Sequence, residues 1–372
     1  MLWKRRTYLD CAAGVSGNPS SPHEEGRKER ETLEDARKDI ARLLEVQTDD
    51  VIFTSGATEA NALAILGHVR ALRASGRTMH VLYLPSAHAS VVENAKLLAT
   101  EGVSVEPLPI REYRIDIEAL AKMLRPDTVL VSMDAVCGET GVVWNTREVA
   151  DVLKKSRAHA PVLHVDASQA PFTEKMTRAH FGADMLTLDA SKVCAARGIG
   201  ALVAHRTIPL VPLYGGGRQE RGLRSGSEAP ELAREFAAAL AAAALGREAF
   251  RARAEKERER LIAAVTATVP NVHINEARAQ APNILNLSLP GRDTDYLVAL
   301  LDDAGFAVST RSACETDSEE GSRAVLVLTG DAESARATLR VSWGPDTRPR
   351  ELALFASALA RAVAFIDSNG QG

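Results

Sequence analysis

Two short apolar runs, each leading to a reactive side chain, constrain this chain more than any other feature of its sequence. Residues 163–166 are LHVD and end in Asp166, and residues 185–188 are MLTL and are soon followed by Lys192. Runs of this length and composition are typical of buried strands. Because ligands bind beyond the carboxyl ends of parallel strands, we expect Asp166 and Lys192 to face one crevice.

Gln169 lies three residues after Asp166 and adds a neutral polar group to the same predicted crevice. A lysine alone after a strand is most often a solvated surface residue. Together, however, these three side chains match the needs of pyridoxal 5'-phosphate (PLP). The lysine binds the cofactor covalently, the carboxylate keeps its pyridine nitrogen protonated, and the polar group holds the ring hydroxyl.

Further motifs make the sequence similar to one known family. They are DASQA at 166–170, SK at 191–192, GIGAL at 198–202, GGG at 215–217 and ERGLRSGS at 220–227. The similarity begins at YLDCAAG, residues 8–14, and continues to RVSWG, residues 340–344. The chain thus resembles the cysteine desulfurases, which are class V, fold-type I PLP enzymes, and in particular the subgroup with a long SAC catalytic loop.

This resemblance implies an α/β fold of the fold-type I PLP-transferase kind. The large domain is expected to have a mostly parallel seven-stranded sheet flanked by helices, and the smaller domain to be α+β. We predict a large PLP-binding domain at residues 14–250, and a small domain at 1–13 and 251–372 that carries the catalytic cysteine loop. The length of 372 residues agrees with about two domains.

Composition narrows the class of protein further. The 45 Lys and Arg residues nearly balance the 49 Asp and Glu residues, so the net charge indicates neither a nucleic-acid nor an acidic-membrane partner. The four cysteines lie far apart without a CxxC pair, which argues against a metal site and a disulfide framework. The longest apolar run, near residues 236–245, is too short to span a bilayer. We therefore predict a cytoplasmic protein with reduced thiols.

The phosphate of the cofactor is expected at residues 55–61, SGATEAN, which follow the predicted strand 51–53. Free N–H groups at the start of a helix bind anions, and here they would come from Ala57 and Thr58. The resemblance adds Ser191 to this site. It also adds Ser227 from a second protomer, at a position where the family has threonine, and so implies a homodimer.

Several site residues depart from the family pattern. The resemblance assigns His88 to stacking on the cofactor ring and to proton handling, but relatives usually have Glu-His where this chain has Ala87 and His88. Relatives have two asparagines at the positions of Cys137 and Gly138. In the family an asparagine of this pair contacts cofactor and substrate, so the resemblance implies that Cys137 lines the substrate site.

The residues before the lysine depart as well. Relatives have serine and histidine where this chain has Asp189 and Ser191, and both family residues reach the phosphate. A carboxylate near a phosphate dianion would repel it. We therefore expect Asp189 to point elsewhere or to pair with an arginine such as Arg197, and PLP to bind less tightly than in relatives.

Cys314 determines which reaction the resemblance implies. It lies in SAC, residues 312–314, ahead of an acidic stretch without apolar periodicity, and it matches the desulfurase nucleophile. Arg340 matches the arginine that grips the substrate carboxylate through both oxygens. The implied reaction converts L-cysteine into L-alanine and leaves a persulfide on Cys314. An acceptor protein of iron–sulfur cluster assembly or tRNA thiolation would then take the sulfur.

Two other functions stay open at this point. The chain is alternatively another PLP enzyme of the same fold, such as a selenocysteine lyase, β-lyase or aminotransferase, in which Cys314 is dispensable. The third possibility is a weakened, non-catalytic assembly partner. The substitutions that motivate it are Cys137, Gly138, Asp189 and Ser191.

Overall fold

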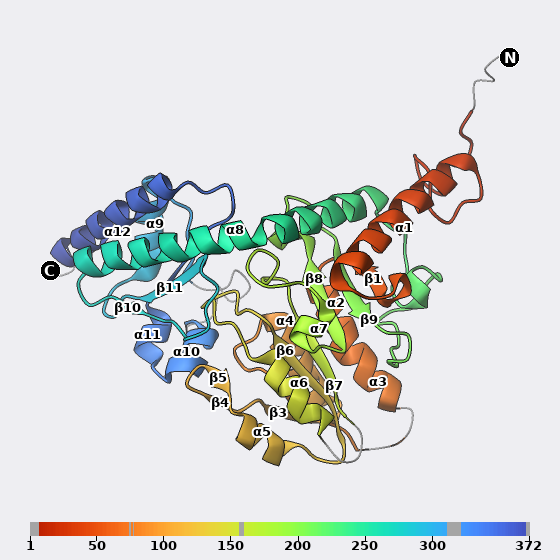
Figure 1. Cartoon of the computed structure of the whole chain (residues 1–372), viewed down its shortest axis with the longest axis horizontal. Coiled ribbons are helices and arrows are strands. Elements are labelled where there is room, and N and C mark those ends of the chain that lie inside the picture. The colour runs from red at the N-terminus through yellow and green to blue at the C-terminus, as the bar shows by residue number, and fades with distance from the viewer. Residues whose placement is uncertain (1–6, 74–75, 77, 156–159, 311–320, 370–372) are drawn as a thin grey trace.

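The computed structural model describes residues 7–73, 76, 78–155, 160–310 and 321–369 (Figure 1). Its centre is a seven-stranded sheet with the order β1-β9-β8-β7-β6-β2-β3. The strands in this spatial order are Val51–Thr54, Gly200–Ala204, Met185–Asp189, Val162–Asp166, Thr128–Asp134, His80–Tyr83 and Ser104–Pro107.

The strand pairings confirm the mostly parallel sheet that the sequence predicts. Four neighbouring pairs are parallel, from β8 through β7, β6 and β2 to β3. Strand β9 runs antiparallel to both β8 and β1. Every residue of β1 and β9 is buried, as expected for strands covered by helices on both faces.

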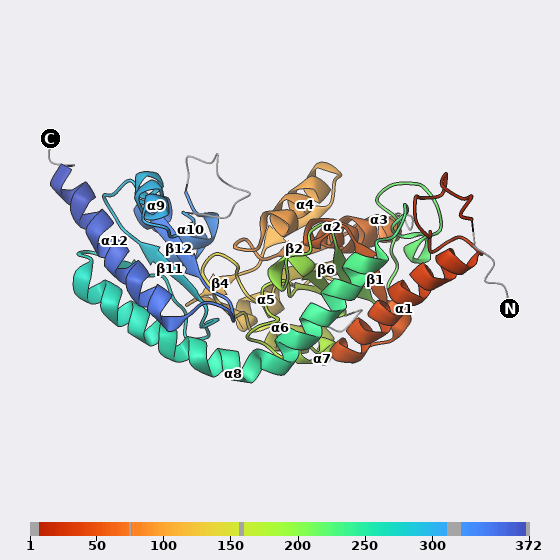
Figure 2. The same cartoon turned by 90° about the horizontal axis from the view of Figure 1, so that it is seen from above.

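Helices cover both faces of this sheet. Figure 2 shows α2, α3 and α4 on one side of it, and α6, α7 and α8 on the other. The helices of this part are α1 Glu24–Leu44, α2 Ala57–Ala62, α3 His68–Arg73, α4 Ala89–Thr100, α5 Ile117–Met123, α6 Thr146–Lys154 and α7 Arg178–Phe181. A π-helical turn, Leu63–Gly67, joins α2 to α3, and a small hairpin pairs β4 Ile110–Arg111 with β5 Arg114–Ile115.

Helix α1 illustrates how the sequence pattern becomes packing. Leu33, Ile40 and Leu44 recur at helical spacing and are buried on one side of the helix. The His23 ring accepts a hydrogen bond from Gly26 N at the start of α1, and the helix ends where Glu45 adopts a left-handed conformation. This spacing in the sequence predicts an amphipathic helix over residues 27–44, and the structure confirms it with one more turn at its beginning.

A second, smaller sheet has the order β10-β11-β12 and is antiparallel. Its strands are His273–Ile274, Ile284–Ser288 and Thr338–Ser342, and its helices are α9 Thr294–Asp303, α10 Arg323–Thr329, α11 Ala332–Arg336 and α12 Pro349–Asn369. Leu285, Leu287, Leu339 and Val341 of this sheet form a hydrophobic core with Phe355 and Leu359 of α12.

Helix α8, Pro230–Thr268, connects the two cores (Figure 1). Phe236 and Leu240 in its first half belong to the core of the large sheet, whereas Phe250 and Leu261 belong to the smaller core. The sequence predicts this helix at residues 229–265. We propose that the boundary between the two domains falls within it, near residue 250.

Residues 7–13 contact the beginning of α1. The Asp10 carboxylate accepts a hydrogen bond from Ser21 Oγ (2.9 Å) and lies 3.0 Å from His23 Nε2. On these contacts we propose that residues 7–13 belong with the larger domain; the sequence-based assignment of residues 1–13 to the smaller one stays a prediction. In the described part of the chain, no helix has both the length and the apolarity needed to cross a membrane.

Candidate active site

Asp166 ends β7 at the carboxyl edge of the large sheet and is buried, with 6% of its surface exposed. Its Oδ1 accepts a hydrogen bond from Ser168 N at 2.9 Å. Its Oδ2 accepts one from Asn61 Nδ2 of α2 at 2.7 Å. Two donors from different elements therefore fix the orientation of this carboxylate, as a partner for a protonated ring nitrogen requires.

Asn61 extends this arrangement toward His88. The Asn61 amide is also 2.8 Å from Ser90 Oγ, and Ser90 Oγ is 2.8 Å from His88 Nδ1. The His88 ring itself is exposed at the start of α4. The sequence analysis missed Asn61 and Ser90. The available signal for Asn61 was its place one helical turn after Ala57, in the same SGATEAN motif.

Lys192 is exposed and ends a short 3₁₀ turn, Ala190–Lys192, directly after β8. Asp189 ends β8 and caps this turn, because its Oδ1 accepts a hydrogen bond from Ser191 N at 2.8 Å. Asp189 Oδ2 accepts another hydrogen bond from Ala57 N at 3.0 Å. The expectation that Asp189 points away from the phosphate site, or pairs with Arg197, is therefore wrong.

The start of α2 has the shape expected of an anion site, but Asp189 already binds there. Gly56 has φ 152°, a conformation that L residues with a side chain rarely adopt. A Cβ built on Gly56 would lie 3.5 Å from Asp189 Oδ2, so the carboxylate lies directly against this turn. Thr58 is exposed beside it, and its hydroxyl is a further possible donor.

Gly138 lies between Gln169 and Arg340. A Cβ built on Gly138 would come 2.9 Å from Gln169 Nε2, so the glutamine amide packs closely over this glycine. Arg340, on β12 of the smaller sheet, donates a hydrogen bond from Nη1 to Gly138 O at 3.2 Å. The structure thus brings a residue of the smaller sheet to the carboxyl edge of the large one. Asparagine at position 138 would require Gln169 to move.

Cys137 is buried, with 1% of its surface exposed, and its Sγ lies 3.9 Å from Ser86 O. Burial, together with the nearby carboxyl of Asp134, raises the pKa of this thiol to about 12. Cys137 is therefore a buried, neutral thiol at ordinary pH. Cys314, the predicted nucleophile, lies outside the described residues.

Asp134, which the sequence analysis did not single out, lies beside Asp166 in the register of β6 and β7. It is 4% exposed, and within the described structure its Oδ1 has no hydrogen-bond partner. Burial, and next the negative charge of Asp166, raise the pKa of the Asp134 carboxyl to about 8. Arg323 at the start of α10 opposes this rise.

We expect the stability of the protein to fall as pH rises from about 4 to about 8 because of Asp134. In this window the folded chain retains a proton that the unfolded chain releases. The free energy of unfolding therefore falls with each unit by which the pH rises. Asp134→Asn should remove this slope, since an amide resembles the protonated acid. Between pH 4 and 8, the free energy of unfolding of the variant, measured in urea, should rise relative to that of wild type by up to about 5 kcal/mol. Parallel stability profiles for both proteins would contradict the assignment.

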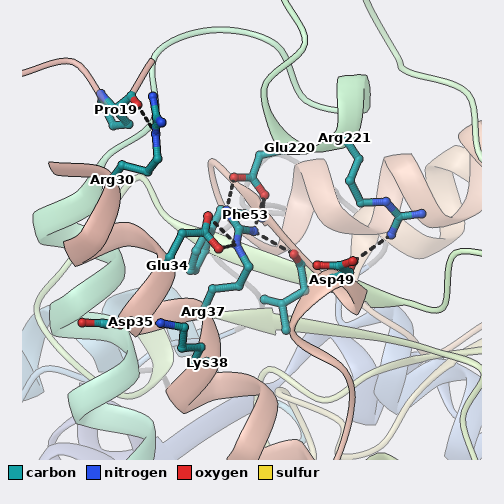
Figure 3. Close-up of polar contacts among 11 residues, drawn as sticks. Pro19, Arg30, Glu34, Asp35, Arg37, Lys38, Asp49, Phe53, Glu220 and Arg221 are labelled. Carbon is teal, nitrogen blue, oxygen red and sulfur yellow. Dashed lines mark hydrogen bonds and ion pairs between the residues drawn. The ribbon is translucent and has the colours of Figure 1, made fainter. Parts of the chain in front are cut away.

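Ser227 is exposed in the loop that joins β9 to α8, and a buried ion pair anchors this loop (Figure 3). Arg37 Nη1 and Nη2 of α1 lie 2.7 and 2.6 Å from the two carboxylate oxygens of Glu220. Glu220 Oε2 also accepts a hydrogen bond from Phe53 N of β1 at 2.7 Å. The Arg37 guanidinium lies over the Phe53 ring, 4.8 Å from its centroid.

PLP fits these residues at its ring end. The buried carboxylate of Asp166, the amide of Gln169, the ring of His88 and the accessible amine of Lys192 supply the groups that its chemistry requires. At the phosphate end, Ala57 N already donates its hydrogen bond to Asp189 Oδ2. It can donate to a phosphate only after that hydrogen bond is broken.

Comparison with known proteins agrees with this geometry. Cysteine desulfurase IscS 1 from Archaeoglobus fulgidus is 35% identical over 331 residues, 88% of this chain and 85% of that protein. Cysteine desulfurase IscS from Dictyoglomus turgidum is 30% identical, over 97% of this chain and 95% of its own length.

Solved structures give the same result. A NifS-like protein superposes with a TM-score of 0.86 at 27% identity, covering 94% of this chain and 92% of that one. DndA from Streptomyces lividans has a TM-score of 0.74 at 33% identity, covering 88% and 92%. Residues 7–355 match the aminotransferase class-V family, and the chain therefore belongs to this family of PLP-dependent enzymes.

Proposed function

We propose that the protein is a PLP-dependent cysteine desulfurase. It removes the sulfur of L-cysteine, releases L-alanine and keeps the sulfur as a persulfide on Cys314. The observation that supports this most is the meeting of Asp166 and the Lys192 turn at one edge of the sheet, with Arg340 reaching Gly138 from the smaller sheet. The relatives named above are cysteine desulfurases.

Each residue has a role in this proposal. Arg340 binds the substrate carboxylate through two hydrogen bonds. Asp166 pairs with the ring nitrogen, Gln169 with the ring hydroxyl, and Ala57, Thr58 and Ser191 with the phosphate. When bound, PLP supplies an electron-accepting ring. The amine of Lys192 moves the proton at the substrate α-carbon, and His88 stacks on the ring and assists this transfer.

The sulfur then leaves by nucleophilic attack. The Cys314 thiolate attacks the substrate sulfur, so an S–S bond forms and the C–S bond breaks. The electron pair of the broken bond stays with carbon, which gains a proton and becomes the methyl group of L-alanine. A thiol of an acceptor protein takes the terminal sulfur from Cys314. The acceptor is a protein of iron–sulfur cluster assembly or of tRNA thiolation.

We further propose a cytoplasmic homodimer, in which Ser227 of one protomer reaches the cofactor phosphate of the other. The exposure of Ser227 supports this, as does the Arg37–Glu220 ion pair, because a fixed loop presents the hydroxyl in a defined position. The described cysteines Cys11, Cys137 and Cys194 form no disulfide, which agrees with a reducing compartment.

Replacement of Cys314 by alanine should abolish persulfide formation and reduce alanine release from L-cysteine by more than about 10³-fold. The absorbance of bound PLP should stay unchanged, because Cys314 attacks the substrate and does not hold the cofactor. Cys11→Ala, which removes an exposed thiol, is the matched control. Undiminished alanine release would instead identify another PLP enzyme of this fold, and failure of the wild type to take up PLP would identify a non-catalytic partner.

A further inference from the structure

Asp189 occupies the position where the cofactor phosphate is expected. Its Oδ2 accepts a hydrogen bond from Ala57 N at 3.0 Å, and its Oδ1 accepts one from Ser191 N at 2.8 Å. The carboxylate therefore bridges the beginning of α2 and the turn that ends in Lys192. Both amides belong to residues assigned above to the phosphate end of the site.

The carboxylate supplies what the local sequence of α2 lacks. Gly56 is the residue before α2 and has no side chain to cap its free N–H groups. Asp189 provides this cap from a strand 132 residues away in sequence. The helical path continues from α2 through Leu63–Gly67 into α3, so the cap stabilises the start of a long segment.

One backbone N–H cannot donate a full hydrogen bond to two anions. A phosphate that approached Ala57 N with Asp189 in place would also meet a negative charge at close range, and this repulsion is stronger in a half-buried site than in water. Asp189 is half-buried, so water screens this repulsion only in part.

We propose that Asp189 is an internal anion that competes with the cofactor phosphate for the start of α2. Binding of PLP then requires the carboxylate to leave Ala57 N, and loss of PLP lets it return. Asp189 thereby stabilises the cofactor-free protein and lowers the affinity of the protein for PLP. This inference rests on the proposed function, because it takes PLP as the ligand.

The competition predicts opposite effects of one substitution. Asp189→Ser removes the charge and keeps a small polar group. It should tighten PLP binding by about ten- to a hundredfold, because the Ala57 amide becomes free for the phosphate. The same substitution should lower the melting temperature of the cofactor-free protein, because the helix start loses its cap. Asp189→Asn keeps a possible hydrogen bond to Ala57 without the charge and should tighten binding less.

Pyridoxal, which lacks the phosphate, is the matched control ligand. The dissociation constants of PLP and pyridoxal should be measured on cofactor-free wild type, Asp189→Ser and Asp189→Asn by the change in ligand absorbance on binding. PLP should bind more tightly to the variants, whereas pyridoxal should bind equally to all three proteins. Inorganic phosphate should raise the melting temperature of cofactor-free Asp189→Ser more than that of wild type.

The remaining outcomes decide for or against the inference and the proposed function. Unchanged PLP affinity in both variants, or equal tightening of PLP and pyridoxal, would overturn the competition at the phosphate end. If Asp189→Ser does not fold, the comparison of PLP with pyridoxal on Asp189→Asn decides. If no protein binds PLP, the proposed function fails too. If only the variants bind it, the competition is supported in its strongest form.

Discussion

Replacing Lys192 by alanine is expected to eliminate covalently bound PLP and to lower kcat by at least the roughly 10²–10⁴-fold that a positioned acid–base group contributes. The substitution removes two functions at once, because the amine of Lys192 both holds the cofactor and moves the proton at the substrate α-carbon. Lys192 is exposed in its turn, so the substitution leaves the packing of the sheet intact and the protein should fold normally. Borohydride reduction of the loaded protein, followed by peptide mapping, measures the covalent label.

Lys175→Ala is the matched control, since Lys175 is also exposed but lies in the connection before β8, whereas Lys192 follows that strand. It should retain both the label and the activity. A borohydride label on any lysine other than Lys192 would refute the assignment. Retention of the label with loss of activity would separate cofactor binding from proton transfer and refute the double role.

Replacing Glu220 by alanine is expected to destabilise the protein by about 3–5 kcal/mol. Arg37 would then remain buried without its carboxylate, and Phe53 N would lose its acceptor (Figure 3). Burial lowers the pKa of Arg37, and the hydrogen bonds and charge of Glu220 more than offset this and raise it, so the arginine stays charged. The free energy of unfolding in urea measures the loss.

The exposed pair of Arg234 and Glu231 on α8 is the control for this second prediction. Glu231→Ala should cost less than about 1 kcal/mol, because solvent screens exposed ion pairs. Arg37→Met combined with Glu220→Leu should recover part of the stability lost in Glu220→Ala, since no buried charge then lacks a partner. A loss in Glu220→Ala as small as that in Glu231→Ala would show that the buried pair is not a stabilising anchor.

Much of this architecture could be predicted from local patterns in the sequence. The apolar runs before Asp166 and Lys192 give the strands, and the rule that ligands bind beyond strand ends gives their common edge. Helix α1 follows from the spacing of its apolar residues, and α8 from a long stretch that is rich in alanine and in charged helix formers. These features depend on residues close together in the chain.

The missed residues depend instead on packing between distant segments. Asn61 reaches Asp166 because α2 lies against the large sheet, and Glu220 reaches Arg37 across 183 residues of sequence. Neither contact produces a periodic pattern in the amino-acid sequence. The expectation for Asp189 failed for a different reason: it considered repulsion from a phosphate, but not the attraction of two backbone N–H groups, those of Ala57 and Ser191.

The length of α8 has a consequence for leverage. At 1.5 Å per residue, its 39 residues follow a curved path about 58 Å long (Figure 2). A tilt of about 5° at one end of a helix of this length displaces the other end by about 5 Å. The first half packs in the larger core and the second half in the core that includes β12. The position of Arg340 relative to the edge of the large sheet therefore depends on the orientation of α8, which packs against α1.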